Sequence, residues 1–436
     1  MKVVIIGGGV AGLSAAYELS KKGADVILLE KAPVLGGLAS SFPLESSYIE
    51  RYYHFICLND FALFSLLKEL GIDKRLNWVY TKMGLFYKGK IYPFSRPWDL
   101  MRFPYLTFGE KLKFGFGLMD IKRKGVDDWK DIEMRKADEW LKEQFGENIY
   151  YILHEPLIRH KFGSYAQKIS AAWMWARIHR IGKSRSKILQ REILGYIDGG
   201  TKTLVDELEK RITSNGGKIR LKERAEKIIH KNGRVCAVQF EKGEIECDAI
   251  ISTISAPELA EIIPDGDGPY WDKIRKIESI GVVCALLITK ESLSENFWLN
   301  INDPKINLAG VIEYSNLNPC HFLNGSKVLY MPQYIHSEHP IFKNTKEEII
   351  NTYSKYLSRI NSRFSEDSIE KAFVFKDKYA QPICETGFSA LTPGIKTSIK
   401  GLYITDSCQL HPDDRTISNS INLGKKAAEM LSADLM

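Results

Sequence analysis

The chain has 436 residues, which is more than one ordinary hydrophobic core holds, so we expect two interleaved domains. Its composition, 44% hydrophobic and 26% charged, is that of a globular protein, and a net charge of +7 is too small a basic excess to indicate nucleic-acid binding. The longest clean apolar run, 281–288, is far shorter than the ~20 residues of a membrane-spanning helix. Because the first strand starts at Lys2, we expect no signal peptide and a cytoplasmic location.

The first forty residues predict a dinucleotide-binding unit. An apolar strand at 3–6 runs into Gly7-Gly8-Gly9-Val10-Ala11-Gly12, and a helix ending near Gly23 and a strand at 25–29 follow. Glycines in such a turn let the backbone approach a pyrophosphate at the helix N-terminus. Glu30, at the tip of the second strand, is placed to accept hydrogen bonds from ribose hydroxyls.

A second glycine pair follows Glu30 in Gly36-Gly37-Leu38-Ala39-Ser40, and it lets the backbone approach the far half of an extended ligand. Together the two motifs resemble the flavoprotein superfamily of amine oxidases, phytoene desaturases and protoporphyrinogen oxidases. The resemblance implies FAD as the cofactor. The FAD contacts that it implies in this part of the chain are Gly7, Gly9, Val10, Ala11, Gly12, Glu30, Lys31, Gly36, Gly37, Leu38 and Ala39.

The C-terminal segment resembles the other half of the FAD site in the same superfamily. A short strand at 401–406 ends in Asp406, and a helix is expected at 416–430. In relatives, the acid contacts the ribityl and pyrophosphate region, and the start of the helix points its amides at the flavin pyrimidine. The matching residues are Asp406, Ile417 and Ser418, although Thr405 stands where relatives usually have Gly.

The middle of the chain leaves this unit and returns to it. Residues 197–257 predict a helix after Gly199-Gly200 and short strands at 218–221, 225–229, 235–240 and 248–253. The resemblance implies that Ala225 lies over the adenine and that Thr253 returns toward the pyrophosphate. The other two parts predict helices at 61–71, 137–145, 184–193 and 346–360, and strands at 280–290, 307–314 and 327–334.

We therefore expect an α/β fold with two domains. One is a Rossmann-type, glutathione-reductase-like FAD-binding domain, and the other is a discontinuous α+β substrate domain with an antiparallel sheet roofed by helices. The FAD-binding domain is expected to comprise residues 1–60, 197–257 and 385–436, and the substrate domain residues 61–196 and 258–384.

Four residues are candidates for a role beside the flavin ring. His54 lies in Glu50-Arg51-Tyr52-Tyr53-His54-Phe55, a stretch that relatives pass along the isoalloxazine edge, and Tyr53 is expected to contact FAD there. Arg159 or Lys161 could stabilise the anionic reduced flavin, and Tyr379 could sandwich a substrate. Each also has an ordinary interpretation: a structural histidine, solvated cations and a core aromatic residue.

Other cofactors are not supported. The seven cysteines form no C-x-x-C pair, which argues against a redox-disulfide reductase and a zinc ribbon. Cys384 lacks the context of a covalent flavin linkage, so FAD is expected to bind non-covalently. His336 and His339 have no third ligand nearby, so no metal site is expected. Gly115 and Gly117 lack the preceding strand of an NAD(P)H motif.

The resemblance implies an FAD-dependent oxidase, dehydrogenase or desaturase. Its flavin would take a hydride from a C–H or C–N centre of a lipophilic or amine small-molecule substrate, and an external acceptor, O2 or a quinone, would reoxidise it. A UDP-galactopyranose mutase-like isomerase is an alternative because mutases have a histidine at the position of His54, but Cys57 stands where they have a second. A non-catalytic prenyl-binding protein is another, against which Gly36-Gly37 and Asp406 argue. The oligomeric state stays open.

Residues 101–125 interleave aromatic and basic side chains. This mixture fits either a helix packed on the domain surface or a peripheral contact with an anionic membrane.

Overall fold

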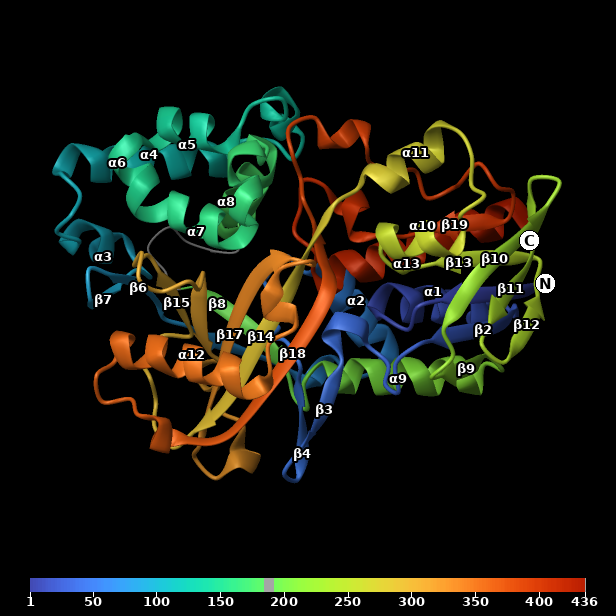
Figure 1. Ribbon diagram of the computed structural model, residues 1–436, viewed down its shortest axis with the longest axis horizontal. Helices are drawn as coiled ribbons and strands as arrows, with labels where there is room; N and C mark the ends of the chain where they lie inside the picture. The colour runs from blue at the N-terminus through green and yellow to red at the C-terminus, as the bar shows by residue number, and fades with distance from the viewer. Residues whose placement is uncertain (184–191, 436) are drawn as a thin grey trace.

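The computed structural model describes residues 1–183 and 192–435. Figure 1 shows an antiparallel sheet below a group of helices on the left and a parallel sheet with its helices on the right. Both chain termini lie in the right-hand region, where segments from the beginning, middle and end of the sequence come together.

A five-stranded parallel sheet forms the centre of the right-hand region, in the order β19-β13-β1-β2-β9. Successive residues of β1 enter different cores: Val3 packs with the helices and Val4 with a three-stranded antiparallel sheet. Both faces are covered, which explains the nearly continuous apolar strands. The strands are β1 (Lys2–Ile6), β2 (Asp25–Glu30), β9 (Lys218–Leu221), β13 (Ala249–Ser252) and β19 (Leu402–Ile404); the smaller sheet contains β10 (Ala225–Lys231), β11 (Arg234–Phe240) and β12 (Gly243–Glu246).

Three helices cover the same face of the parallel sheet: α1 (Val10–Lys21), α9 (Thr201–Ser214) and α13 (Ile417–Leu435). The approach of α13 to α1 is very close, because a Cβ atom on Gly424 would lie 2.1 Å from the carbonyl oxygen of Ala11. This contact holds the start of the C-terminal helix beside the first glycine loop.

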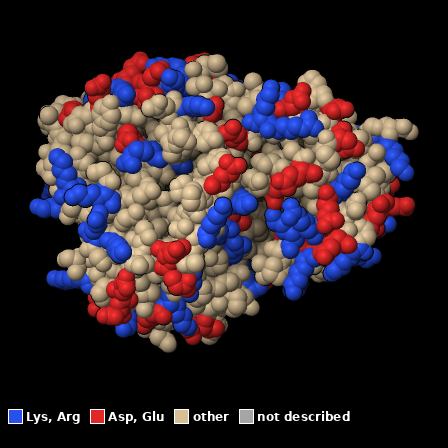
Figure 2. All heavy atoms as spheres, viewed as in Figure 1, with Lys and Arg blue, Asp and Glu red and all other residues tan. Residues whose placement is uncertain are grey.

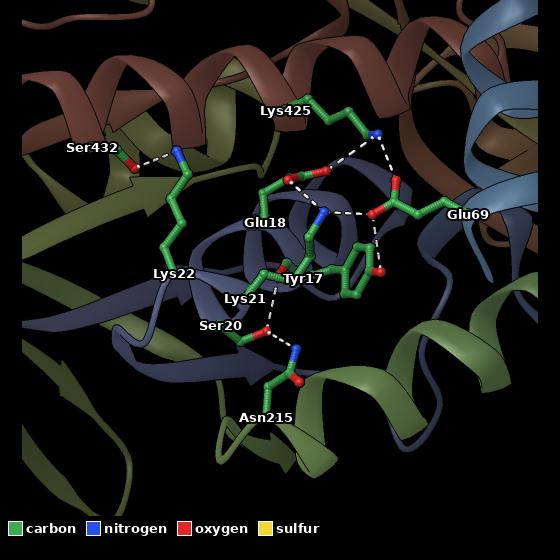
Figure 3. A network of polar contacts seen from close by, with 9 residues as sticks. All are labelled: Tyr17, Glu18, Ser20, Lys21, Lys22, Glu69, Asn215, Lys425 and Ser432. Carbon is green, nitrogen blue, oxygen red and sulfur yellow. Dashed lines mark hydrogen bonds and ion pairs between the residues drawn. The ribbon is translucent and has the colours of Figure 1, made fainter.

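Polar contacts surround the C-terminal end of α1 (Figure 3). Lys425 of α13 bridges Glu18 at 3.2 Å and Glu69 at 3.5 Å, and Glu69 also accepts a hydrogen bond from Tyr17 at 3.1 Å. Glu69 belongs to α2 (Phe61–Leu70), so the network ties three helices together. Such exposed ion pairs each contribute little to stability, and we assign the network a role in alignment.

A seven-stranded sheet forms the left-hand region, in the order β18-β14-β17-β16-β15-β6-β7. It is antiparallel apart from the β15–β6 pair. The strands β6 and β7 were not among the elements expected in 61–196, a part that the sequence pattern indicates to be helix-rich. The strands are β6 (Met83–Tyr87), β7 (Lys90–Pro93), β14 (Ser279–Thr289), β15 (Trp298–Ile301), β16 (Gly310–Glu313), β17 (Lys327–His336) and β18 (Ile369–Pro382).

Helices lie above this sheet and α12 (Lys346–Ile360) packs on it (Figure 1). The upper group contains α3 (Pro97–Arg102), α4 (Phe108–Arg123), α5 (Ala137–Phe145), α6 (Glu147–Ile149), α7 (Glu155–Phe162) and α8 (Ala171–Lys183). Most of the helix expected at 184–193 lies outside the described residues, and Ile193 begins a strand instead. The remaining elements are β3 (Ser41–Leu44), β4 (Ser47–Glu50), β5 (Leu76–Tyr80), β8 (Ile193–Ile197), α10 (Ala256–Ile262) and α11 (Pro269–Lys276).

The observed sheets agree with the expected fold class, and the domain boundaries themselves stay a prediction. Within the two described ranges, no helix has the length and apolar character needed to cross a membrane.

Candidate active site

The first glycine loop lies at the carboxyl end of β1, where parallel α/β sheets bind their ligands. A Cβ atom on Gly12 would lie 2.0 Å from the carbonyl oxygen of Gly7, so the loop folds tightly onto the start of α1. A Cβ atom on Gly9 would meet no atom of the described chain within 4 Å, so the space beside Gly9 is open. Gly36 and Gly37 have φ angles of 109° and 58° and lie against Gly9. The two loops thus form one glycine-lined cradle that fits a pyrophosphate.

A cavity lies beside this cradle and is open to solvent, with ≈ 430 Å³ of empty space that includes part of that solvent. Glu30 lies at its edge and accepts hydrogen bonds from the amides of Gly8 and Ala32, each at 2.7 Å. These bonds fix the carboxylate where the ribose of a dinucleotide is expected. The walls include Gly7, Lys31, Ala225, Ile254 and Glu258, and Lys31 forms an ion pair with Glu258. Its place beside the cradle and Glu30 makes it the candidate adenosine site.

Asp406 follows β19, and its carboxylate bonds the backbone at the start of α10 and just after β19. It is half-buried, and removal from solvent raises the pKa of its carboxyl. It accepts hydrogen bonds from the amides of Cys408 at 2.6 Å and Ala256 at 3.0 Å. The Thr405 hydroxyl is buried and finds no hydrogen-bond partner among the described residues, so it is available to a ligand. Thr253 instead bonds the carbonyl oxygens of Ile6 and Gly7 at 3.1 Å and closes the base of the cradle.

A second cavity of ≈ 210 Å³ contains His54 and Ile417, the first residue of α13. Burial lowers the pKa of His54 to about 4, and its Nδ1 atom meets no partner in the described part of the chain. The imidazole is therefore neutral at ordinary pH and can exchange a hydrogen bond with a ligand. Ser418 points elsewhere, because its hydroxyl accepts a 3.4 Å hydrogen bond from Leu63 of α2.

Buried Glu50 forms another wall of this second cavity. It accepts a 3.0 Å hydrogen bond from the amide of Thr201, whose hydroxyl donates to the carbonyl oxygen of Ala39 at 2.7 Å. Burial raises the pKa of Glu50, whereas the bond from Thr201 opposes the rise. Thr201 thus ties the start of α9 both to Glu50 of β4 and to Ala39 after the second glycine pair.

A group of cations lies between the upper helices and the loop before α13. Lys161 is buried, and its ammonium lies 3.7 Å from the Asp414 carboxylate and 4.6 Å from the centre of the Trp173 ring. Arg177 approaches the same carboxylate at 3.3 Å. Burial lowers the pKa of Lys161 to about 7, whereas Lys161 and the neighbouring arginines together bring the pKa of Asp414 to about 2 against the opposing effect of burial.

Residues 10–404 match the model of the family described as flavin containing amine oxidoreductase. The chain belongs to this family. Membership confirms the predicted FAD cofactor and the predicted class of FAD-dependent oxidoreductase.

Individual relatives of this flavin amine oxidoreductase are distant. The chain is 23% identical over 313 residues to the 15-cis-phytoene desaturase of Synechococcus elongatus, a match that covers 65% of the chain and 64% of the relative. Of the same enzyme from Glycine max it covers 53%, so the chain spans about half to two thirds of the curated relatives it matches.

Two solved structures show the fold alone. The cyclohexylamine oxidase of Brevibacterium oxydans matches with a TM-score of 0.74 and 14% identity over 100% of the chain and 99% of that protein. A reduced UDP-galactopyranose mutase matches with a TM-score of 0.76 and 16% identity over 100% of the chain and 96% of that protein.

The four candidates for the flavin ring lie in different places. Lys161 points inward between Asp414 and Trp173, whereas Arg159, two residues earlier on α7, is 43% exposed and pairs with Glu155 at 2.9 Å. Tyr379 is half-buried, and burial raises the pKa of its phenol together with the Glu261 and Glu258 carboxylates, of which Glu258 lines the cavity beside Glu30. Tyr53 lies next to the cation group, because it shares a hydrogen bond with Tyr334, whose ring lies 5.2 Å from Lys161.

Sequence reasoning missed Glu50, Arg177 and Asp414. Glu50 stood in a stretch that we singled out, but its partner Thr201 is distant in the sequence. The charged run Asp413-Asp414-Arg415 directly before the C-terminal helix was a visible signal in this family member.

Proposed function

We propose that this flavin amine oxidoreductase removes a hydride from a C–H or C–N carbon of a small organic substrate held between the upper helices and the FAD cradle. The observation that carries the proposal is the glycine cradle, with the candidate adenosine cavity on one side and the half-buried Asp406 on the other. When bound, FAD supplies the hydride acceptor, and an external oxidant such as O2 or a quinone receives the electrons.

The residues of the chain orient the reactants and handle protons. In this proposal Gly7, Gly9 and Gly12 hold the pyrophosphate, and Glu30 and Asp406 take hydroxyl groups of the cofactor. The neutral imidazole of His54 supplies a hydrogen bond near the ring. Lys161, with a pKa of about 7, can accept a proton from a substrate N–H or O–H at neutral pH as the hydride leaves. Arg159 is exposed and pairs with Glu155, so we propose no proton transfer through it, and we assign none to Tyr379.

Anaerobic flavin reduction tests the proposal. The FAD-loaded protein is mixed with a panel of primary amines and polyenes, and loss of oxidised-flavin absorbance is followed before O2 or a quinone is added. We expect bleaching by at least one class and recovery with the acceptor. Acid precipitation should release the flavin from the protein, because the linkage is non-covalent. A protein that does not bind FAD, or whose bound flavin neither class reduces, would contradict the proposal.

Isomerisation of a UDP-sugar is a second candidate, favoured by the cations between the upper helices and the loop before α13. Cys57 stands at the position of the second mutase histidine, and its sulfur accepts a 3.5 Å hydrogen bond from Arg180. Burial raises the pKa of this thiol to about 12. It is therefore no base at neutral pH. If dithionite-reduced protein interconverts the ring forms of a UDP-sugar, this candidate replaces net oxidation.

We also propose a peripheral contact with anionic membranes through α3 and α4. Phe103, Leu106 and Phe114 are buried, as a packed helix requires, but a second apolar set is exposed: Trp98, Met101, Phe108, Leu112 and Phe116. In Figure 2, Lys and Arg side chains predominate along the edge of the molecule where α3 and β7 lie. Exposed aromatic residues beside cations suit the headgroup boundary of an anionic bilayer.

A further inference from the structure

Lys161 and three arginines lie between the upper helices and the loop before α13, and among the described residues one of these arginines has no ion-pair partner. We name Lys161, Arg177, Arg180 and Arg415 the cation cluster. Asp414 serves both Lys161 and Arg177, at 3.7 and 3.3 Å. Arg180 lies 3.7 Å from Asp60, whose carboxylate also accepts a hydrogen bond from the amide of Cys57.

Arg415 is the member of the cluster that is only partly compensated, because the Asp414 carboxylate acts on it electrostatically but lies beyond ion-pair distance. It forms no ion pair within residues 1–183 and 192–435, and its Nη1 atom is buried there without a hydrogen-bond partner. Its guanidinium lies 5.8 Å from the centre of the Tyr334 ring, which compensates only part of the cost of taking a cation out of water. A partly buried guanidinium whose buried Nη1 donor is unused is expected where a ligand supplies the missing acceptor.

The cluster is partly open to solvent and lies close to His54, so a ligand bound there could also reach the expected flavin site. Arg177 and Arg180 are 21% and 19% exposed, so the cluster is partly open to solvent. Trp173 and Tyr334 provide aromatic surface beside Lys161, at 4.6 and 5.2 Å from the ammonium. Arg415 also acts electrostatically on His54, which lines the second cavity.

The cofactor itself does not need these side chains for its phosphates. A pyrophosphate at the glycine cradle is bound by backbone amides and the N-terminus of α1. The cation cluster is built from α7, α8 and the loop before α13, so it faces the substrate side of the molecule.

We propose that the cation cluster binds an anionic group of the substrate, a carboxylate or a phosphate, and so orients the substrate beside the flavin site. This inference rests on the proposed function, and it narrows the substrate class to organic anions. Arg177 and Arg415 would make the main contacts, because guanidinium forks match both groups bidentately. They act in binding and orientation, not in hydride transfer.

Anion titrations test the inference on the FAD-loaded protein. Sodium pyrophosphate and sodium succinate are added separately at constant ionic strength against sodium chloride, and tryptophan fluorescence and the flavin difference spectrum are recorded. We expect a saturable response to at least one of the two probes. The stronger response distinguishes a phosphate site from a carboxylate site.

Three variants give the test its controls. Arg177→Gln and Arg415→Gln should each weaken the response by about 10-fold or more, as expected for one lost charge-assisted hydrogen bond. Arg363→Gln is the control: Arg363 is exposed and distant from the cluster in the sequence, so this variant should leave the response to anions unchanged. If Arg177→Gln fails to fold, Arg415→Gln decides, because Arg415 has no ion pair among the described residues to lose.

The outcomes separate this inference from the proposed function. A response no greater than that of chloride, or one that persists in both cluster variants, overturns the anion site even if amines or polyenes reduce the flavin. A normal anion response in a protein whose flavin no substrate reduces contradicts the oxidoreductase proposal and leaves the anion site standing.

Discussion

The ammonium of Lys161 lies 3.7 Å from the carboxylate of Asp414 and joins α7 to the loop before α13. Burial is the main cause that lowers the pKa of Lys161 to about 7, Arg177 and Arg415 act in the same direction, and Asp414 opposes them. The pair therefore couples protonation to the contact between the upper helices and the FAD-binding region.

This coupling predicts a pH dependence of stability. Between about pH 7 and the ordinary lysine value of 10.5, the unfolded chain binds a proton at Lys161 that the folded protein does not, so the free energy of unfolding rises with pH across this window. Lys161→Met should flatten that rise. Urea unfolding at about pH 6.5 and about pH 9.5 measures the change in the free energy of unfolding. Lys346→Met, at an exposed lysine, is the control. An equal rise in the Lys161 variant would contradict the assignment.

Removal of the shared carboxylate should destabilise the fold. Asp414→Asn leaves Lys161 and Arg177 without their common anion, and we expect a loss of about 3 kcal/mol in the free energy of unfolding. The double variant Asp414→Asn with Lys161→Met should recover part of it, because one uncompensated cation is gone. Denaturant unfolding of the single and double variants measures the coupling, and strictly additive effects would show that the two side chains act independently.

Two glycines of the first loop should respond differently to alanine. Gly12→Ala places a Cβ atom 2.0 Å from the carbonyl oxygen of Gly7, so we expect it to lower both the thermal stability of the apoprotein and FAD binding. Gly9→Ala meets no described atom within 4 Å, so it should leave apoprotein stability nearly unchanged while it blocks the pyrophosphate. Melting curves without flavin and FAD titrations measure the two effects. Unaltered FAD affinity in Gly9→Ala would place the pyrophosphate elsewhere.

Asp406→Ala should weaken FAD binding. The substitution removes the acceptor for the amides of Cys408 and Ala256 and a carboxylate that faces the ligand, at a cost of ~1–3 kcal/mol for unsatisfied donors. The FAD-to-protein ratio after gel filtration and a fluorescence titration measure it. Ala at the exposed Asp25, at the start of β2, is the control. Full FAD occupancy in the Asp406 variant would be evidence against its assigned role.

The exposed apolar face of α4 should bind anionic vesicles reversibly. Phe108 and Phe116 are both 64% exposed, so serine at these positions and at Leu112 removes apolar surface without opening the core. We expect co-flotation with phosphatidylserine vesicles at low salt, less at high salt, and loss in the triple variant. Tyr48→Ser, in the hairpin of β3 and β4, is the control for an exposed aromatic residue. Absence of co-flotation at low salt removes this surface as a membrane contact.

The elements whose signals are local were predictable from the sequence. The expected helices at 137–145 and 346–360 coincide with α5 and α12, because apolar periodicity and a capping residue such as Thr345 act within a few turns. The glycine loop was also predictable, because a tight turn at the end of a strand needs glycines at this spacing. Glu30 was predictable because the same motif places an acidic residue at the end of the second strand.

Contacts between distant segments were not predictable. Arg159 and Lys161 are two residues apart on one helix, and both are basic, so the sequence could not distinguish the exposed side chain from the buried one. The Thr201 amide donates to Glu50 only because α9 packs against a segment that is distant in the sequence. Lys161 likewise pairs with Asp414 only because α7 packs against the loop before α13. The sequence by itself determined the family and the FAD cradle, because their signals lie within short motifs. Only the tertiary structure decided which charges meet in the cation cluster, because burial and pairing depend on how whole helices pack.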